Sequence, residues 1–543
     1  LESFYYGMHY QIGSASRADR FAPGLWGPWI TAETCGWSGD YTLNYNFEAN
    51  YYGVFSDNRP ELAQPYFQTI LNNVELGQWR AAMKKWGSGT SSQTPGFWAQ
   101  DFNHMDQLST DGTGFVDAGY QGIQMPTHFS PWKHFYFVSD WGQKNVGSFT
   151  TKAFMDYYEF TGNVTFLAQT LYPLVKLNGA FYGSYMTKIG GKYNVMHSCA
   201  MEGCGAQGPH TSENITVSNN PPFDLAFVKR TFRSLVEYSE VLGVDESMRA
   251  QWQDYFDNVA DYPLTVSEDG TQVFAQATLN DGPTSTTTDG FPNASHCVWN
   301  PVVESPTKHS DTSQCGNARY PITFFNAMHP GEDVDLASDN DTLRIARNTV
   351  NIVNAINDYS PTNGLCMAWP AAARVVESTA QLLPKFDLAL SHTMMPNFIP
   401  FIANRPTGGS GCNIENAGAT VAVNDLMASI HGHGQHAVLR LFPGGWPAGD
   451  QVTFSNVRVR GAFTVSAEAS GTSNTTVIMH GPVKVQSLAG NALTFVYDWG
   501  GPQTIPTVTE AATSKGVPAS QAPTAGRNAW TFNTSTLKVY LIE

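Results

Sequence analysis

The chain of 543 residues is acidic, with a net charge of −16, and only 14% of its residues are charged. It contains no run of Lys or Arg, which argues against nucleic-acid binding because phosphate recognition needs clustered cations. No apolar stretch is long enough to span a membrane, and the 42% hydrophobic content allows a large core in one to three domains. Aromatic residues reach 13%, a balance typical of aromatic-rich cores and of proteins that stack flat rings on sugars.

A helical period dominates the chain up to about residue 440. The first residues already follow it, and another helix is expected from Pro60, since Phe67, Ile70 and Val74 share one face. Further helices are expected over residues 148–160, 165–186, 222–242, 246–259, 341–358 and 383–402, with shorter ones near 317–328, 365–376 and 416–430. Close to a dozen helices joined by long loops predict a mainly α fold, an (α/α)6 six-hairpin toroid whose loops gather at one end.

Short alternating runs replace the helical period after Pro443. Strands are expected at 452–454, 463–465, 476–479, 493–497 and 537–542, which predict a small C-terminal β-sandwich. Residues 501–527, rich in Pro, Thr and Ala, are expected to form an exposed loop. The predicted domains are therefore residues 1–442, the helical barrel, and residues 443–543, the β-sandwich.

Cysteines and glycosylation signals favour an extracellular protein. The seven cysteines include no CxxC pair, while Cys199–Cys204 and Cys297–Cys315 are close enough in sequence for disulfide bonds. Acceptors for N-glycosylation occur at Asn163, Asn214, Asn293, Asn340, Asn474 and Asn533. We therefore expect a secreted, lysosome-like or cell-wall glycoprotein. No signal peptide is visible, and a chain that starts inside a predicted helix suggests that upstream sequence is missing.

The segment WSGDYTLNYNFEAN at residues 37–50 places Asn44 and Asn46 two residues apart among large aromatic side chains. Buried amides need hydrogen-bond partners. The simplest source of these partners is a hydrogen-bond network within the protein core. A polyhydroxylated ligand with an attacking water is the alternative that carries chemistry.

This segment resembles the WSSDYxLNxNxQMNYW block of the family 95 glycoside hydrolases, the inverting α-L-fucosidases and α-L-galactosidases. Residues 17–29 (RADRFAPGLWGPW), 145–185 and 418–465 are similar, in the same order, to further family segments. The resemblance implies the toroid fold and a glycan substrate. It begins near the first residue, so no counterpart of the family's N-terminal β-domain is expected within these 543 residues.

An inverting glycosidase needs a general acid and a base-activated water on the opposite face of the sugar. In the family, the acid lies in an SPEN-type loop about twenty residues before a helix that corresponds to residues 224–232 here. Glu202, 22 residues before Asp224, fits this spacing. The rival is Glu213, which matches the motif letters better but lies only 11 residues before Asp224, next to the acceptor Asn214.

The base half is implied to comprise Asn44, Asn46 and an acidic residue. In the family, an Asn carbonyl holds the water, and a carboxylate in an IDGNFG segment accepts the amide N–H. This chain has IENAG at 414–418, one residue shorter, with Glu415 in place of Asp. The extra methylene of Glu either compensates for the deletion or misplaces the carboxylate.

The sugar-binding segment departs from the family. Where the family has HRH, whose His and Arg grip the deoxysugar, this chain has Arg319, Tyr320 and Pro321. Such a loss should change specificity sharply, so the sugar is left open between L-fucose, L-galactose and other glycosides. The candidate substrate-binding residues are Trp26, Trp29, Trp37, Asp40 and Arg319.

The function that these features predict is a secreted inverting exo-glycosidase acting on α-linked deoxy- or L-sugars of glycans. The alternative is a catalytically inactive carbohydrate-binding or structural glycoprotein that keeps the barrel. No cofactor is expected. No metal is expected either, because His431, His433 and His436 have no nearby carboxylate or Cys to complete a site. The oligomeric state is left open.

Overall fold

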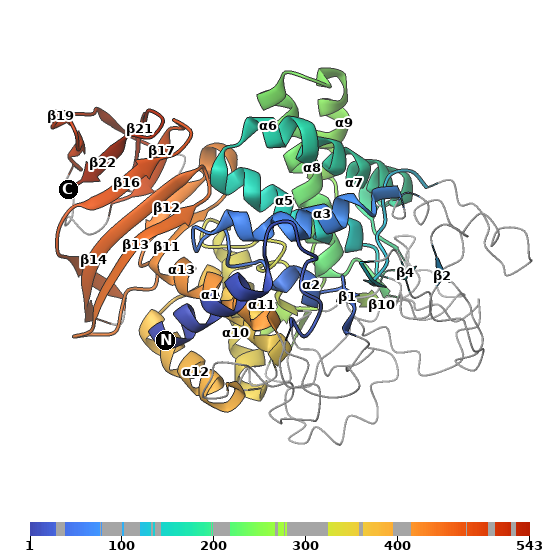
Figure 1. Ribbon diagram of the computed structural model, residues 1–543, viewed down its shortest axis with the longest axis horizontal. Helices are drawn as coiled ribbons and strands as arrows, with labels where there is room; N and C mark the ends of the chain where they lie inside the picture. The colour runs from blue at the N-terminus through green and yellow to red at the C-terminus, as the bar shows by residue number, and fades with distance from the viewer. Residues whose placement is uncertain are drawn as a thin grey trace, which may run out of the picture.

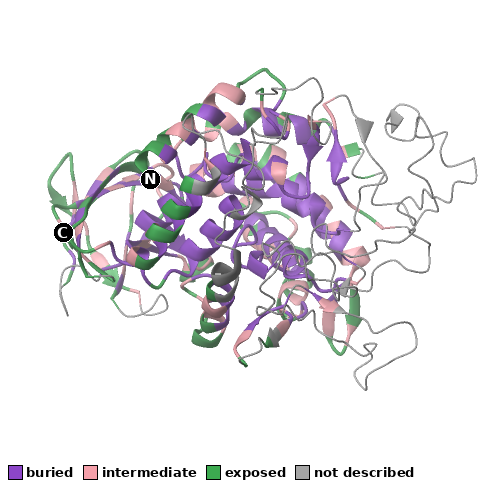
Figure 2. Cartoon of the chain, turned by 90° about the horizontal axis from the view of Figure 1, so that it is seen from below, coloured by how far each residue is buried: buried purple, intermediate pink, exposed green. Residues whose placement is uncertain are grey.

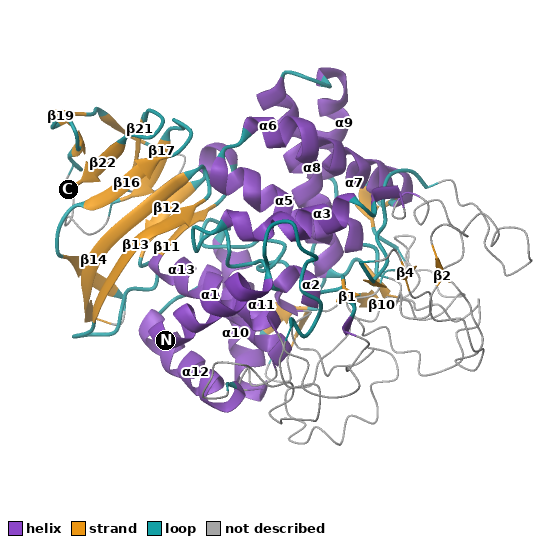
Figure 3. Cartoon of the chain, in the orientation of Figure 1, coloured by secondary structure: helices purple, strands orange, loops and turns teal. Residues whose placement is uncertain are grey.

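The computed structural model describes residues 1–28, 39–75, 78, 100–101, 120–131, 134–135, 143–196, 198, 218–266, 270–275, 277–279, 324–357, 362–394, 414–473, 475–497, 505–522 and 528–543. Helices make up most of the described chain before residue 428, and strands make up most of it afterwards (Figures 1 and 3). The N-terminal helix lies among the helices, and the C-terminus lies at the far edge of the strand-rich region (Figure 1).

The helices occur where an apolar face recurs every three to four residues. The α-helices are α1 (Glu2–Ala15), α2 (Asn46–Ala49), α3 (Gln64–Leu71), α5 (Val146–Thr161), α6 (Val164–Phe166), α7 (Tyr172–Tyr185), α8 (Pro222–Leu242), α9 (Glu246–Asp257), α10 (Asn340–Asn357), α11 (Thr362–Arg374), α12 (Thr379–Thr393) and α13 (Thr420–Met427). Short 3₁₀ or π turns form η2 (Pro60–Ala63), η4 (Leu167–Leu171), η6 (Ile414–Ala419) and η7 (Gly434–His436). Within the described residues, no helix is both long and apolar enough to cross a membrane.

The ends of the helices show which sequence signals determine where a helix begins and ends. Helix α8 has the predicted bounds because Pro222 is pre-organised for its first turn and Gly243 adopts the left-handed conformation that ends it. Helix α12 begins four residues before the predicted start at 383. The backbone N–H of Thr379 donates to the carbonyl of Gly444 at 2.9 Å, a tertiary contact that periodicity does not reveal. The described part of the predicted helix near 317–328 is a short turn from Phe324 onward.

Short strands lie among the helices and loops of the first part of the chain. They are β1 (Tyr41–Thr42), β2 (Gln100–Asp101), β3 (His128–Phe129), β4 (His134–Phe135), β5 (Thr187–Ile189), β6 (Lys192–Asn194), β7 (Ser218–Asn219), β8 (Leu264–Val266), β9 (Gln272–Phe274) and β10 (Thr278–Leu279). The sheet that matters for the candidate site has the order β1-β3-β4-β2.

Two larger sheets form the C-terminal region. One has the order β11-β12-β17-β21-β20, and the other β13-β14-β16-β22-β18-β19 with β15 beside β14. The two sheets pack against each other where the rings of Phe532 and Tyr540 lie 5.4 Å apart. Their strands are β11 (Ala428–His431), β12 (Val438–Leu441), β13 (Gln451–Val459), β14 (Phe463–Ser473), β15 (Thr476–Met479), β16 (Val483–Ser487), β17 (Leu493–Val496), β18 (Val508–Glu510), β19 (Lys515–Gly516), β20 (Ala519–Gln521), β21 (Ala529–Phe532) and β22 (Val539–Ile542).

The strands differ from the prediction in several places, and β16 and β21 were not expected. Strands β11 and β12 precede Pro443, because residues 428–431 leave the predicted helix at 416–430 and pair with residues 438–441. The loop predicted for 501–527 is wrong over the described residues 505–522, because β18 pairs with β22 and β20 pairs with β21, although most of these residues are exposed as predicted. Strands of two or three residues are too short to show the alternation that marks a strand. The division of the chain into domains at residue 442 stays a prediction.

A buried ion cluster joins the helices to the sheets. The carboxylate of Glu332 forms ion pairs with Lys152 of α5 at 3.1 Å, Arg230 of α8 at 3.4 Å and Arg374 of α11 at 3.2 Å, and it lies 3.7 Å from Arg460, which follows β13. Burial alone raises the pKa of Glu332, but these cations outweigh it and hold the pKa well below its ordinary value. Figure 2 shows that much of the interior of the helical region is buried, and Glu332, Arg230 and Arg374 are among its buried residues.

Replacing Glu332 by Gln should destabilise the fold by about 3–5 kcal/mol at neutral pH, because four cations lose their shared counter-charge. A carboxyl with a lowered pKa stabilises the fold above its ordinary pKa, and this contribution is lost as the pH falls through the folded-state pKa. The difference from wild type, measured by urea unfolding, should therefore shrink on acidification. The control is Asp341→Asn, which removes one partner of an exposed pair with Arg344 and should change little. Equal effects of the two substitutions would contradict the assigned role of the cluster.

Candidate active site

A short antiparallel pairing carries the chain into the Asn44–Asn46 segment. Tyr41 and Thr42 of β1 pair with Phe129 and His128 of β3, and the N–H of Leu43 donates to the carbonyl of Thr127 at 2.7 Å. The chain then turns into α2, whose first residue is Asn46. Asn44 is fully buried, while Asn46 is partly exposed. The pairing therefore leads the chain into α2 with Asn46 as the more exposed of the two amides.

The structure brings together Asn46 and Glu415, which are 369 residues apart in sequence. The amide nitrogen Nδ2 of Asn46 donates to Oε2 of Glu415. Glu415 lies in η6 and is fully buried. Because the amide N–H donates to a carboxylate, the oxygen Oδ1 of Asn46 becomes a better hydrogen-bond acceptor.

Two glycines allow the segments of Asn46 and Glu415 to approach closely. A Cβ at Gly418 would lie 2.1 Å from the carbonyl oxygen of Ala49, and a Cβ at Gly53 would lie 2.0 Å from Oγ1 of Thr420. Asp57 adds a polar clamp, since it accepts from Thr420 at 2.8 Å and from Asn424 at 2.7 Å. The contact between Asn46 and Glu415 is thus held on both sides by backbone packing.

Weak acids that stay protonated surround Glu415. Burial and then the charge of Glu415 raise the pKa of the Cys366 thiol well above its ordinary value. Burial raises the pKa of Tyr45 in the same way, with Cys366 and Glu415 adding to it. The Tyr45 hydroxyl and the Cys366 thiol also form a hydrogen bond with each other. The wall behind Asn46 therefore contains neutral groups around one carboxylate, where electrostatic interactions are weakly screened.

Asp40, a predicted substrate-binding residue, makes contacts within the protein. Its carboxylate lies 2.9 Å from Nδ1 of His128 and accepts from Oγ1 of Thr42 at 2.7 Å. His128 is a polar residue of this region that the sequence analysis missed. No motif marks it, because it reaches Asp40 only through the pairing of β1 with β3.

The protein interior contains buried polar side chains without hydrogen-bond partners among the described residues. Such groups are rare in proteins and commonly receive a water or a ligand. They include both side-chain polar atoms of Glu48, Asn50, Gln143, Asn145, Asn326 and His329. The rings of His329 and Tyr52 lie 4.6 Å apart, which places one of these residues beside the segment that follows α2.

The N-terminal ends of α5 and α8 meet at Ser198, which precedes the predicted acid Glu202 in sequence. Oγ of Ser198 donates to Asp224 at 2.7 Å and accepts from the backbone N–H of Lys144 at 3.2 Å. Burial raises the pKa of Asp224 to about 7, although the hydrogen bond from Ser198 and the charge of Lys144 oppose this. In the sequence, Asp224 only marks the helix from which the position of Glu202 is counted. Its environment is not visible there, because it depends on Ser198, which lies 26 residues away.

The other predicted site residues fall into three groups. Glu202, Glu213, Trp29, Trp37, Arg319, Asn214, Asn293 and Asn474 lie outside the described residues, as do all cysteines except Cys366, which is a buried free thiol. Asn163, Asn340 and Asn533 are exposed. Trp26 is only 1% exposed, so its ring has no open face for a sugar, and the predicted stacking role does not fit this position.

Comparisons with known proteins bear on the family and the fold of the chain. The model of the glycosyl hydrolase family 95 catalytic domain matches residues 2–273, half of the chain. The protein named Probable alpha-fucosidase A of Aspergillus oryzae is 37% identical over 70 residues, which are 13% of this chain and 10% of that protein. A provisionally named kojibiose phosphorylase from the human microbiome has a similar fold, with a TM-score of 0.52 and 11% identity over 91% of this chain and 60% of that one.

The chain belongs to glycosyl hydrolase family 95. It spans less than two thirds of the length of either protein named above. Asn44 and Asn46 lie within the part that matches the family model, whereas Glu415 lies beyond it.

Replacing Glu48 by Gln should stabilise the protein increasingly as the pH rises. Burial raises the pKa of Glu48 well above its ordinary value of 4.5. Below about pH 4 the carboxyl is protonated in both the folded and unfolded states, so the substitution has little charge effect there. Above that pH only the unfolded state ionises freely, which favours unfolding of the wild type. Melting temperatures from about pH 4 to about pH 8 measure the difference.

Glu377, an exposed glutamate, provides the matched control for this experiment. Glu377→Gln should leave the pH dependence of the melting temperature unchanged. A difference between Glu48→Gln and wild type that stays constant over this pH range would show that Glu48 is ionised in the folded protein.

Proposed function

We propose that this chain is a secreted inverting exo-glycosidase that removes α-linked deoxy- or L-sugars of the fucose and galactose type from glycans. In this proposal the helices form an (α/α)6 toroid, and Asn163, Asn340 and Asn533 are among the residues that carry N-glycans. The observation that carries it is the hydrogen bond from Asn46 to the buried Glu415. Membership of family 95 and the name of the Aspergillus oryzae relative support the sugar class.

The base half of the proposed mechanism uses an amide instead of a free carboxylate. Glu415 accepts the Nδ2–H of Asn46, so negative charge accumulates on Oδ1. Oδ1 accepts a hydrogen bond from the attacking water and so aligns a lone pair of the water with the anomeric carbon. As the water attacks, Oδ1 takes its proton while Nδ2 passes a proton to Glu415 along the existing hydrogen bond, so that the released proton is held by the Asn46–Glu415 pair.

The acid half of the proposed mechanism is Glu202, with Glu213 as its rival. The acid protonates the leaving oxygen on the face opposite the water, and the configuration at the anomeric carbon inverts. Asn44 is proposed to position the water together with Asn46. Trp29, Trp37, Asp40 and Arg319 are proposed sugar contacts.

Glu415→Gln and Asn46→Ala should each lower kcat by about 10²–10⁴-fold, because each removes the activation of the water. The double variant should lose little more than either single variant, since the two residues act as one unit. Turnover is measured with aryl α-L-fucosides and α-L-galactosides, and NMR of the first-formed anomer tests inversion. Glu468→Gln, an exposed glutamate of β14, is the control.

Two outcomes would contradict the proposal. One is full turnover in both single variants. The other is no turnover by the wild type with any aryl glycoside while glycans still bind. The second outcome would favour the alternative, a carbohydrate-binding protein without catalysis, which the altered residues 319–321 favour.

Aryl glycosides with different leaving groups separate the acid from the base. Glu202→Gln should lower kcat strongly with phenyl glycosides but little with dinitrophenyl glycosides, whose leaving group needs no proton. Glu415→Gln should lower kcat with both. If Glu213→Gln shows the first pattern and Glu202→Gln does not, the acid is Glu213.

A further inference from the structure

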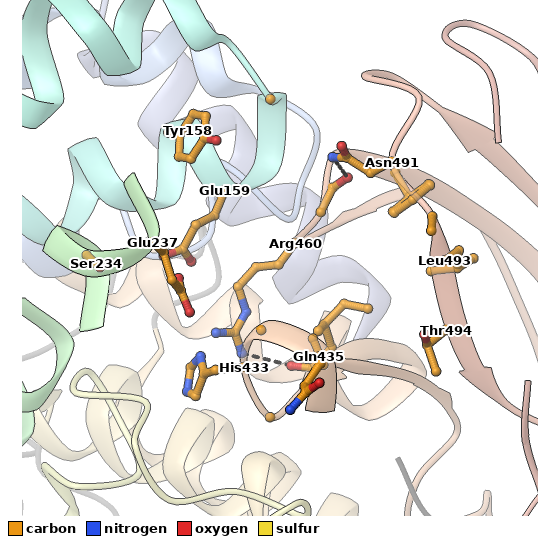
Figure 4. A pocket seen from close by; sticks show the side chains of 18 of the residues that line it. Tyr158, Glu159, Ser234, Glu237, His433, Gln435, Arg460, Asn491, Leu493 and Thr494 are labelled. Atoms are coloured by element: carbon orange, nitrogen blue, oxygen red, sulfur yellow. Dashed lines mark hydrogen bonds between the residues drawn. The ribbon is translucent and has the colours of Figure 1, made fainter. Parts of the chain in front are cut away.

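A cavity of about 430 Å³ lies between the helices and the C-terminal sheets. Its walls come from the last turns of α5 and α8, from the turn around η7, and from the sheet residues around Arg460 and Asn491 (Figure 4). The volume falls within the range of small-ligand sites. Nothing in the proposed mechanism uses it.

The cavity lies at the opposite ends of α5 and α8 from the Ser198–Asp224 contact. Glu159 follows the start of α5 by 13 residues, and Glu237 follows Asp224 by the same number. At 1.5 Å per residue, each separation corresponds to about 20 Å along the helix. A ligand in the cavity would therefore be bound well away from the Ser198–Asp224 contact.

Most charged groups of the cavity already have partners in the protein. Glu159 accepts from Arg230 at 3.4 Å and from the Tyr238 hydroxyl at 3.5 Å. Arg460 donates to the carbonyl of Ile430 at 2.8 Å and lies 3.7 Å from Glu332. Arg233 lies 3.4 Å from Asp333.

Glu237 is different, because it has no hydrogen bond or ion pair among the described residues. Figure 4 shows its carboxylate beside that of Glu159, facing the guanidinium of Arg460 across the cavity. Burial raises the pKa of Glu237, with Arg233 opposing and Glu159 adding to the shift. Its carboxylate thus lies in a half-buried place where a hydrogen-bond donor from a ligand would stabilise it.

The mixture of groups selects the kind of ligand. The carboxylates of Glu159 and Glu237 disfavour an anion, and the guanidinium groups of Arg233 and Arg460 disfavour a cation. Carboxylates that accept, together with arginine and amide groups that donate, match the hydroxyls of a neutral polyol, each of which donates and accepts. Tyr158 adds an aromatic ring at the rim.

We propose that this cavity binds a neutral carbohydrate unit through Glu237, Gln435 and the ring of Tyr158, as a site separate from the catalytic one. The bound sugar would be anchored by its hydroxyls on Glu237, and its ring would lie against Tyr158. The site does not depend on the catalytic roles given to Asn46 and Glu415.

Ligand-observed NMR and calorimetry on the full chain test the site, with L-fucose, N-acetylglucosamine, lactose and mannobiose as probes. At least one of these sugars should bind. Glu237→Ala and Tyr158→Ala should each lower the affinity for that sugar by about tenfold. Glu240→Ala, an exposed change on the same helix, and Glu415→Gln should leave this binding unchanged. Unfolding curves of each variant report whether the fold is intact.

The outcomes separate this site from the catalytic one. Binding that is lost in Glu415→Gln but kept in Glu237→Ala would overturn the proposal and place the sugar at the catalytic site. Binding of spermidine or citrate to the cavity, with none of the four sugars, would also overturn it. Loss of sugar binding in Glu237→Ala together with unchanged kcat toward aryl glycosides would establish the site whatever the catalytic mechanism is.

Discussion

The structure depends on the close approach of two segments that lie near opposite ends of the helical region. Residues 44–57 and 414–424 contact each other through Gly53 and Gly418, where any side chain would overlap the opposite segment. The hydrogen bond from Asn46 to Glu415 lies within this contact, and Asp57 clamps it through Thr420 and Asn424. A difference of one methylene or one residue here changes the geometry of the candidate site directly. Glu415 reaches the Asn46 amide from a segment that is one residue shorter than the family pattern, where the acid is Asp.

The candidate site depends on acidic groups that stay protonated as well as on a carboxylate that is ionised. Tyr45 and Cys366 remain protonated around Glu415, and burial does the same to Glu48. Glu48 stands where the family block has Gln, so a neutral carboxyl provides a similar pattern of hydrogen-bonding atoms. Elsewhere the protein does the opposite, since Glu332 remains ionised because four cations surround it. Burial raises the pKa of all of these acids, and the charges of their neighbours determine whether the pKa ends above or below its ordinary value.

Sequence reasoning succeeded where the signals are local and failed where they are not. Helix α8 has its predicted bounds because Pro222 and Gly243 mark them, whereas α12 begins early because Thr379 bonds to Gly444. The short strands within 501–527 were missed because they pair with distant segments that no sequence pattern identifies. The contact between Asn46 and Glu415 followed from family resemblance, not from spacing. The cavity at Glu237 is assembled from several distant segments, and no motif indicates it.

The ion cluster around Glu332 has a consequence for how the molecule can be divided. Arg460, from the strand-rich region, shares one buried carboxylate with Lys152, Arg230 and Arg374 of the helical region. Backbone contacts reinforce the link, since the N–H of Gly461 donates to the carbonyl of Glu159 at 2.8 Å and that of Arg458 to the carbonyl of Ser56 at 3.0 Å. The sheets therefore complete the interior of the helical region, and they cannot be exchanged as an independent module without opening it to water.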